Sequence, residues 1–407
     1  MQSLDFSHHS ICAGTAAVWG IQGKFIMKQI LGRRQFSIGV GAVALGGFHT
    51  ARAQGEGRIV LGQSAAFTGP SAQLGLQFNK GAKLFFDQLN AQGGVSRRMV
   101  EIRTLDDGYE PERCAENTRK LISEEVFALF GYVGTPTSLA ALPLATQAKV
   151  PFFGPFSGAE ALRQPFNKLV FHVRASYYDE TALIVRQLTN LGLTKIAVFY
   201  QNDAYGMTGL EGVKRALAQL NLTPVATATV ERNSDDVKAA VATLVAVKPD
   251  AVVQISSYMA SAAFVRAARR ASYGGLFYNV SFVGTQALSD ALGKEGAGVV
   301  VSQVVPSPYQ PSRPITREFL EAIKKDGNNV QANYSSMEGY LAARVFTEGL
   351  RQAQVGSKIT RESFVAGTEA IGTQVISGFS VSFSATDHAA SHFVEMSMLV
   401  GDGRVRT

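Results

Sequence analysis

The sequence has few of the side chains from which disulfide frameworks and metal centres are built. Among its 407 residues are 2 cysteines, 6 histidines and 1 tryptophan. Two cysteines, Cys12 and Cys114, are too few for a disulfide scaffold or a cysteine-rich metal site. His388 and His392 are four residues apart, but in a stretch that reads as extended, where this spacing does not bring two metal ligands together. We therefore expect no bound metal and no cofactor.

Sequence motifs of catalysis are also lacking. No G-x-S-x-G, H-E-x-x-H or G-x-x-x-x-G-K-[ST] stretch occurs, so the sequence offers no hydrolase elbow, zinc protease helix or phosphate-binding loop. Cys114 lies on a predicted helix, residues 112–125, without an evident histidine partner, which is typical of a buried small side chain. We do not expect an enzyme, and a secreted hydrolase is an alternative that these absences disfavour.

Positive charge is concentrated at the N-terminus. The net charge is +7, and residues 1–53 hold five basic side chains against one acidic, so the remainder has a net charge of +3. Basic pairs in the remainder, such as Arg269 and Arg270, are typical of a solvated helix face. We therefore expect no nucleic-acid partner.

Residues 1–53 have the pattern of an export signal. In chain order they contain a basic pair, a weakly apolar run and two small residues, which are Arg33 and Arg34, residues 36–48, and Ala51 and Ala53. The apolar run is shorter than the roughly 20 residues of a membrane-spanning helix. The basic pair resembles the twin-arginine export signal. We predict an upstream extension, a translation start at Met27, cleavage after Ala53 and a periplasmic location, reached by the twin-arginine route.

Beyond residue 57, strand-like and helix-like patterns alternate. The expected strands are residues 58–67, 100–107, 127–133, 150–154, 195–201, 224–230, 250–256, 276–283 and 298–305. The expected helices are residues 78–89, 112–125, 138–148, 181–191, 206–220, 234–247 and 259–272. This alternation predicts an α/β protein with mostly parallel sheets. The two series form two doubly wound lobes, and open sheets of this kind bind ligands at the carboxyl ends of their strands.

Hydroxyl side chains follow several of these strand ends. Thr135 is a plausible N-cap of one helix and Ser157 of the next, and two such helix N-termini suit a carboxylate without a metal. Capping alone is the other interpretation, and both stay open at this point. In the second series Tyr205 and Tyr258 stand at helix starts, where tyrosine offers an apolar ring and a hydroxyl together.

Three longer stretches resemble a known family. Residues 64–95, 100–111 and 299–308 are similar to the leucine/isoleucine/valine-binding family of type 1 periplasmic binding proteins, which are substrate-binding proteins of ABC importers. The resemblance covers about residues 58–405.

The resemblance implies two lobes that close around a small ligand and are joined by three crossing segments, near residues 172–175, 304–308 and 373–378. The implied domains are residues 58–173 with 308–373 for the first lobe, and residues 174–307 with 374–405 for the second. It also implies a monomeric receptor that delivers its ligand to an ABC permease in the inner membrane. A sensor of the same fold, which passes its signal to a membrane partner, is the alternative.

The resemblance also implies the ligand contacts. These are Leu74, Thr135, Pro136, Phe156, Ser157, Gly158, Tyr205, Tyr258 and Ser281. Ser281 falls where amino-acid binders of the family have a glutamate that receives the ligand's ammonium group. Because a buried charge needs a partner, we expect a ligand with a carboxylate and an apolar body. It is either an amino acid bound differently or an organic or aromatic acid.

Overall fold

The computed structural model describes residues 57–327, 329–353 and 358–407. The predicted export signal, with Met27, the arginine pair and the cleavage point after Ala53, lies outside these residues. Within them, no helix is both long and apolar enough to cross a membrane.

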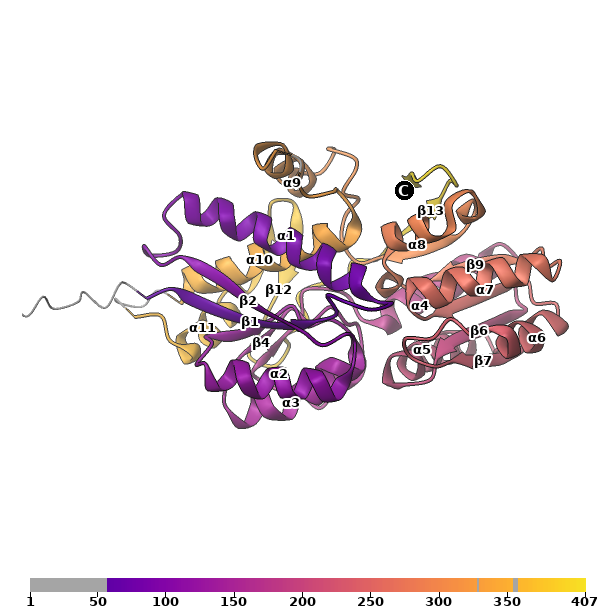
Figure 1. Cartoon of the computed structure of the whole chain (residues 1–407), viewed down its shortest axis with the longest axis horizontal. Coiled ribbons are helices and arrows are strands. Elements are labelled where there is room, and N and C mark those ends of the chain that lie inside the picture. The colour runs from indigo at the N-terminus through magenta and orange to yellow at the C-terminus, as the bar shows by residue number, and fades with distance from the viewer. Residues whose placement is uncertain (1–56, 328, 354–357) are drawn as a thin grey trace, which may run out of the picture. The chain divides into compact units, whose positions relative to one another are not determined.

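The first sheet has five parallel strands in the order β2-β1-β3-β4-β5. The strands are β1 (Ile59–Ala65), β2 (Val100–Asp106), β3 (Ala128–Phe130), β4 (Phe152–Phe153) and β5 (Val170–Phe171). Its helices are α1 (Ala72–Ala91), α2 (Pro111–Ser123), α3 (Thr135–Gln147), α9 (Pro314–Lys325), α10 (Tyr334–Gln352) and α11 (Arg361–Glu369). Figure 1 shows α1 and α10 on one side of this sheet and α2 and α3 on the other. We call this unit the first lobe.

The second sheet has seven strands in the order β14-β13-β10-β9-β8-β6-β7. They are β6 (Ile196–Gln201), β7 (Thr227–Val230), β8 (Ala251–Ile255), β9 (Leu276–Asn279), β10 (Val300–Gln303), β13 (Glu395–Leu399) and β14 (Val405–Arg406). Strands β6 to β10 are parallel, and β13 and β14 are antiparallel to their neighbours. The helices are α4 (Tyr177–Asn190), α5 (Ala204–Ala218), α6 (Lys238–Ala246), α7 (Tyr258–Arg270) and α8 (Thr285–Leu292). This second lobe completes the expected architecture of two parallel-sheet lobes, which is confirmed.

Aromatic side chains fill the core of the first lobe. The Phe153 ring lies 6.2 Å from Phe130 on the neighbouring strand and 5.1 Å from Phe346 on α10. Phe78 and Phe85 are buried on the same face of α1, as the helical spacing of apolar residues predicts. Packing of this kind fixes α1 and α10 against the sheet and so positions the loops at the strand ends.

The segment after α11 differs from expectation. Residues 373–378 were expected to cross between the lobes, but β11 (Thr373–Ile376) pairs with β12 (Phe379–Ser382) in an antiparallel hairpin. The Phe383 ring lies 5.8 Å from Phe171 of the first sheet, so the hairpin packs on the first lobe. The His172 amide donates to the His388 carbonyl over 2.8 Å, which places the later segment beside the first crossing. Residues 373–378 therefore form part of a hairpin on the first lobe, at a place where the resemblance alone implied a crossing.

Candidate functional site

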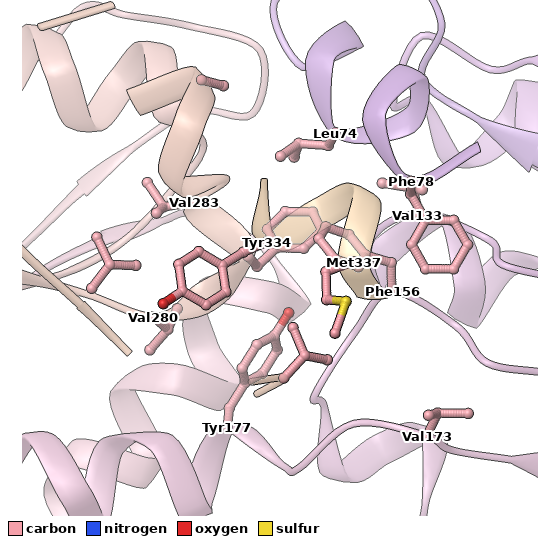
Figure 2. Close-up of a cluster of buried hydrophobic side chains, with 14 of the residues drawn as sticks. Leu74, Phe78, Val133, Phe156, Val173, Tyr177, Val280, Val283, Tyr334 and Met337 are labelled. Carbon is pink, nitrogen blue, oxygen red and sulfur yellow. The ribbon is translucent and has the colours of Figure 1, made fainter. Parts of the chain in front are cut away.

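Aromatic side chains from both lobes meet where the carboxyl ends of the two sheets face each other. The Phe282 ring, from the loop after β9, lies 4.7 Å from Tyr205, 5.6 Å from Phe156 and 5.9 Å from Tyr109. Tyr177, at the start of α4, lies 5.3 Å from Tyr205. All five side chains are buried. We call these residues the interlobe cluster, and Figure 2 shows Leu74, Phe156, Tyr177, Val280 and Val283 around the same place.

Thr135 and Ser157 lie together at the first-lobe side of this cluster, but neither caps a helix in the expected way. Gly134 is the N-cap of α3, with a φ of 100°, and Thr135 is the first helical residue. The hydroxyl groups of Thr135 and Ser157 are hydrogen-bonded to each other at 2.8 Å. Ser157 precedes a short 3₁₀ turn, Glu160–Leu162, whose N-cap is Ala159. Gly134 takes the position before α3 because glycine adopts a positive φ more readily than threonine does. The Ser157 hydroxyl accepts a hydrogen bond from the Ala159 amide over 3.3 Å.

Pro136 and Gly158 adjoin this hydroxyl pair. Pro136 is buried in the first turn of α3, where a missing N–H costs nothing. A Cβ at Gly158 would come within 2.8 Å of the Tyr177 backbone nitrogen, so only glycine allows α4 to approach this loop. Their expected contact with a ligand stays a prediction.

Leu74, Tyr205 and Tyr258 also lie between the lobes. Leu74 is fully buried on α1, and a Cβ on Gly284 of the second lobe would overlap its side chain. Tyr205 is in the first turn of α5, whose N-cap Asp203 accepts hydrogen bonds from the next backbone amides. Tyr258 is the first residue of α7, and its hydroxyl lies against the backbone of Gln73 on α1. The two tyrosines therefore stand at helix starts, as the sequence indicates.

The sequence-based prediction of site residues omitted a buried arginine. Arg174 follows β5 in the first crossing and is 1 % exposed. Its guanidinium carbon lies 4.9 Å above the Phe156 ring and 5.8 Å from the Tyr177 ring. It donates a hydrogen bond to the Ser281 hydroxyl. A charged residue within the apolar run VFHVRAS is the signal that could have identified it, because arginine is rarely buried without a partner.

Two buried carboxylates accompany Arg174, one from each lobe. Glu180 on α4 lies 3.4 Å from the guanidinium and Glu338 on α10 lies 3.6 Å from it. Glu180 also accepts hydrogen bonds from the Ser281 backbone amide, at 2.7 Å, and from the Ser302 hydroxyl. Within the described residues the Glu338 carboxylate makes this ion pair and accepts no further hydrogen bond, so it is the more weakly held of the two.

Burial shifts the pKa values of this group. Loss of solvation raises the pKa of Glu338 to about 7, although Arg174 opposes the shift and Glu180 adds to it. Burial likewise raises the pKa of Glu180, while Arg174 and the Ser281 amide lower it. One guanidinium therefore stands between two acids, one of which changes protonation near neutral pH.

Several polar atoms of the cluster lack hydrogen-bond partners among the described residues. They are the hydroxyl groups of Tyr177 and Tyr205 and the Nε atom of Arg174, all buried. The Nη1 atom of Arg174 makes only the 3.6 Å ion pair with Glu338. Burial raises the pKa of Tyr177 to about 12, and that of Tyr205 lies well above its ordinary value, so both phenols are neutral. Leaving a buried polar group unpaired costs about 1–3 kcal/mol. The interlobe cluster therefore contains polar atoms for which neither lobe supplies a hydrogen-bond partner among the described residues.

Among residues 57–327, 329–353 and 358–407, no three His, Cys, Asp or Glu side chains come together in a way that holds a metal ion. His172 and His388 are buried beside the crossing segments, where each contacts a backbone carbonyl at about 3 Å.

Comparisons with known proteins agree on one family. A family model described as periplasmic binding protein matches residues 58–403. A Leu/Ile/Val-binding protein homolog 7 of Brucella abortus is 25 % identical over 356 residues, covering 81 % of this chain and 88 % of the homolog.

Solved structures of similar fold agree with this family. A possible leucine/isoleucine/valine-binding protein from Rhodopirellula baltica is 34 % identical, with a TM-score of 0.82, over 85 % of this chain and 95 % of that one. A fatty acid ABC transporter substrate-binding protein from Thermomonospora curvata has a TM-score of 0.77 over 85 % of this chain and 90 % of that one, and its 22 % identity shows the fold alone. The chain belongs to the periplasmic binding protein family, as a type 1 member of the leucine/isoleucine/valine-binding kind.

Proposed function

We propose that the protein is the solute-binding receptor of an ABC importer and captures a small carboxylate-bearing ligand between its lobes. The observation that carries this proposal is that the Arg174 Nε atom and the hydroxyl groups of Tyr177 and Tyr205 are buried inside the aromatic interlobe cluster without a hydrogen-bond partner among the described residues. A ligand that hydrogen-bonds to these atoms removes the free-energy cost of leaving them unpaired in the folded chain. Aromatic walls with a few convergent polar groups are typical of small-molecule sites.

The hydroxyl pair of Thr135 and Ser157 suits the ligand's carboxylate. It lies at the N-terminal end of α3, where unpaired backbone amides and the helix dipole favour negative charge. Leu74, Pro136, Phe156 and Gly158 then form its first-lobe surroundings, and Tyr205, Tyr258 and Ser281 those of the second lobe. Ser281 is already bonded to Glu180, so its direct role is smaller than that of the tyrosines. Amino acids and organic or aromatic acids both fit these requirements.

Binding of this kind needs lobes that separate. We propose that residues 58–173 and 308–373, together with the hairpin of β11 and β12 that follows them, move against residues 174–307 and the C-terminal strands β13 and β14. The contact between Phe171 and Phe383 supports keeping the hairpin of β11 and β12 with the first lobe and placing the third crossing near residues 388–394. Only a ligand that touches both lobes favours the closed form. The protein performs no chemical step itself, in keeping with its family.

The partner in this proposal is a permease in the inner membrane, which a monomeric receptor approaches from the periplasm after export by the twin-arginine route. The name of the Thermomonospora curvata neighbour, a substrate-binding protein of an ABC transporter, supports a transport role. A receptor that signals to a membrane kinase is the alternative function. Recovery of a permease with the ligand-loaded protein would favour transport, and recovery of a sensor would favour signalling.

The ligand class is tested by thermal unfolding of the full chain with L-leucine, L-phenylalanine, benzoate or succinate. A true ligand at about 100 times its Kd adds about 2.7 kcal/mol of stability, which raises Tm by several degrees. No response to any amino acid or organic acid in a wider panel would overturn the proposal.

The site is tested with the probe that responds. Tyr177→Phe and Tyr205→Phe should each weaken its binding about fivefold, because each removes one unpartnered hydroxyl from the cluster. Tyr273→Phe is the matched control, since the Tyr273 hydroxyl is also buried without a partner but packs beside Phe277, away from the cluster. Equal affinity in all three variants would show that the ligand binds elsewhere.

A further inference from the structure

A second set of contacts joins the lobes beside the interlobe cluster and leaves the proposed ligand contacts untouched. It connects the turn after β2 in the first lobe with the loop after β7 in the second. Arg232 donates to Glu110 over 2.8 Å. The Asn233 amide group donates to Glu110 over 2.8 Å and to the Gly108 carbonyl over 3.0 Å.

The first-lobe turn is held rigidly by its own hydrogen bonds. Asp107 accepts hydrogen bonds from the Ser64 hydroxyl and the Tyr109 amide, at 2.7 and 2.8 Å. Gly108 and Tyr109 both have positive φ values, 58° and 65°. This geometry directs the Gly108 carbonyl and the Glu110 side chain towards the second lobe. Glu110 precedes α2 but makes no side-chain capping bond there, so its carboxylate is available for the interlobe contact.

The second-lobe loop is also fixed from within its own lobe. Glu231 accepts a hydrogen bond from Asn202 at the end of β6, over 2.8 Å. Arg232 lies 3.7 Å from Asp203, the N-cap residue of α5. Asn233 has a φ of 58°, which asparagine adopts more readily than most residues. The loop therefore presents Arg232 and Asn233 to the first lobe without needing a ligand to order it.

We propose that Glu110, Arg232 and Asn233 form an interlobe latch that sets the closed-to-open equilibrium of the protein before any ligand binds. Two donors converge on the two oxygens of one carboxylate, an arrangement that is stronger than a single exposed ion pair. Because opening the lobes breaks every one of these bonds, the latch stabilises the closed form alone. It therefore raises the affinity for every ligand by the same factor, and it does not select among ligands.

The inference rests on the proposed opening of the lobes but not on the ligand, so the test is made without one. Spin labels are attached to the full chain through Lys120→Cys on α2 and Ala242→Cys on α6, two exposed positions. Cys12→Ser removes one native thiol, and Cys114 is buried. Interlobe distances are then measured by pulsed dipolar spectroscopy for wild type, Glu110→Ala, Arg232→Ala and Asn233→Gly. The last variant keeps the left-handed backbone accessible while removing the amide.

The expected wild-type distribution has a dominant short distance. Each variant should lower the closed-to-open ratio about fivefold, as expected for the loss of a partly exposed ion pair in Glu110→Ala and Arg232→Ala. In Asn233→Gly the loss is that of the amide's hydrogen bonds. Combining Glu110→Ala with Arg232→Ala should lower it little further, because both remove the same bond. Arg266→Ala is the matched control, since its 2.7 Å ion pair with Glu295 lies within the second lobe.

Three results would overturn the proposal: a wild type that is open without ligand, a distribution that no latch variant changes, or an equal shift in Arg266→Ala. A failed ligand screen affects none of these outcomes, because it concerns the cluster and not the latch.

Discussion

Replacing Glu338 by glutamine should make the protein more stable at alkaline pH, although it removes an ion pair. Glu338 is 5 % exposed, and its contact with Arg174 is a 3.6 Å ion pair. Arg174 is closer to Glu180, which holds further hydrogen bonds from Ser281 and Ser302. The ionised Glu338 is therefore desolvated without full compensation. Glutamine keeps the shape of the side chain and has no charge to bury.

The size of the effect follows from the pKa. Burial raises the pKa of Glu338 from 4.5 to about 7, so the folded chain holds this proton more tightly than the unfolded chain. The stability gained in this way is complete below pH 4.5 and is lost as the pH rises through 7. A shift of this size corresponds to about 3 kcal/mol in the free energy of unfolding. The stability of Glu338→Gln relative to wild type should therefore rise by about 3 kcal/mol between pH 4.5 and pH 8.

The assay is urea unfolding of wild type and variant at half-unit pH steps. The difference between the two proteins is the informative quantity, because titrating groups that do not interact with Glu338 contribute equally to both. Glu101→Gln is a suitable control, since Glu101 forms an exposed ion pair with Arg58 and its replacement should change stability little at any pH. A difference between Glu338→Gln and wild type that stays constant from pH 4.5 to 8 would refute the reasoning.

Two further predictions concern buried groups. Arg174→Met should lower the free energy of unfolding by about 3–5 kcal/mol at pH 8, because two buried carboxylates lose their cation. The loss should be smaller at pH 5, where the carboxylates can take up protons, and an equal loss at both pH values in urea unfolding would contradict this account. Burial, with Asp107 adding to its effect, raises the pKa of the Cys114 thiol. A thiol reagent at pH 8 should therefore modify Cys114 only on unfolding, and rapid reaction of the folded chain would contradict its burial.

Local sequence patterns predicted the elements of the two series up to residue 305, but not β5, α8 or any element after that residue, including the long helix α10. The spacing of Phe78, Phe85 and Leu89 identifies α1, and the two glycines after it mark its end. Each further helix and strand of the two series is found close to its expected place. The hairpin at residues 373–382 was not predicted, because three of the four residues of β11 are exposed and give no apolar pattern. Its place on the first lobe depends on packing against Phe171, which is distant in the sequence and which no local pattern contains.

Helix capping could be predicted only in part. Thr135 was expected to cap α3 because threonine is a common N-cap residue, yet Gly134 takes that position. Which residue is the cap depends on a left-handed turn that brings α3 close to Tyr109, whose ring a Cβ on Gly134 would overlap. The identity of this neighbour is set by tertiary structure. The sequence therefore located the hydroxyl groups correctly but assigned them the wrong partners.

The charges of the site show why substitution at one position is a weak guide to the ligand. Serine at position 281, where amino-acid binders of the family have glutamate, suggested that no carboxylate would be near. The structure brings Glu180 to that serine from α4, 101 residues earlier in the chain. It also brings Glu338 from the other lobe to the same guanidinium. A buried charge is neutralised by the residues that lie near it in space, and these can be far from it in the sequence. Position 281 therefore has a carboxylate beside it, although its own side chain carries none.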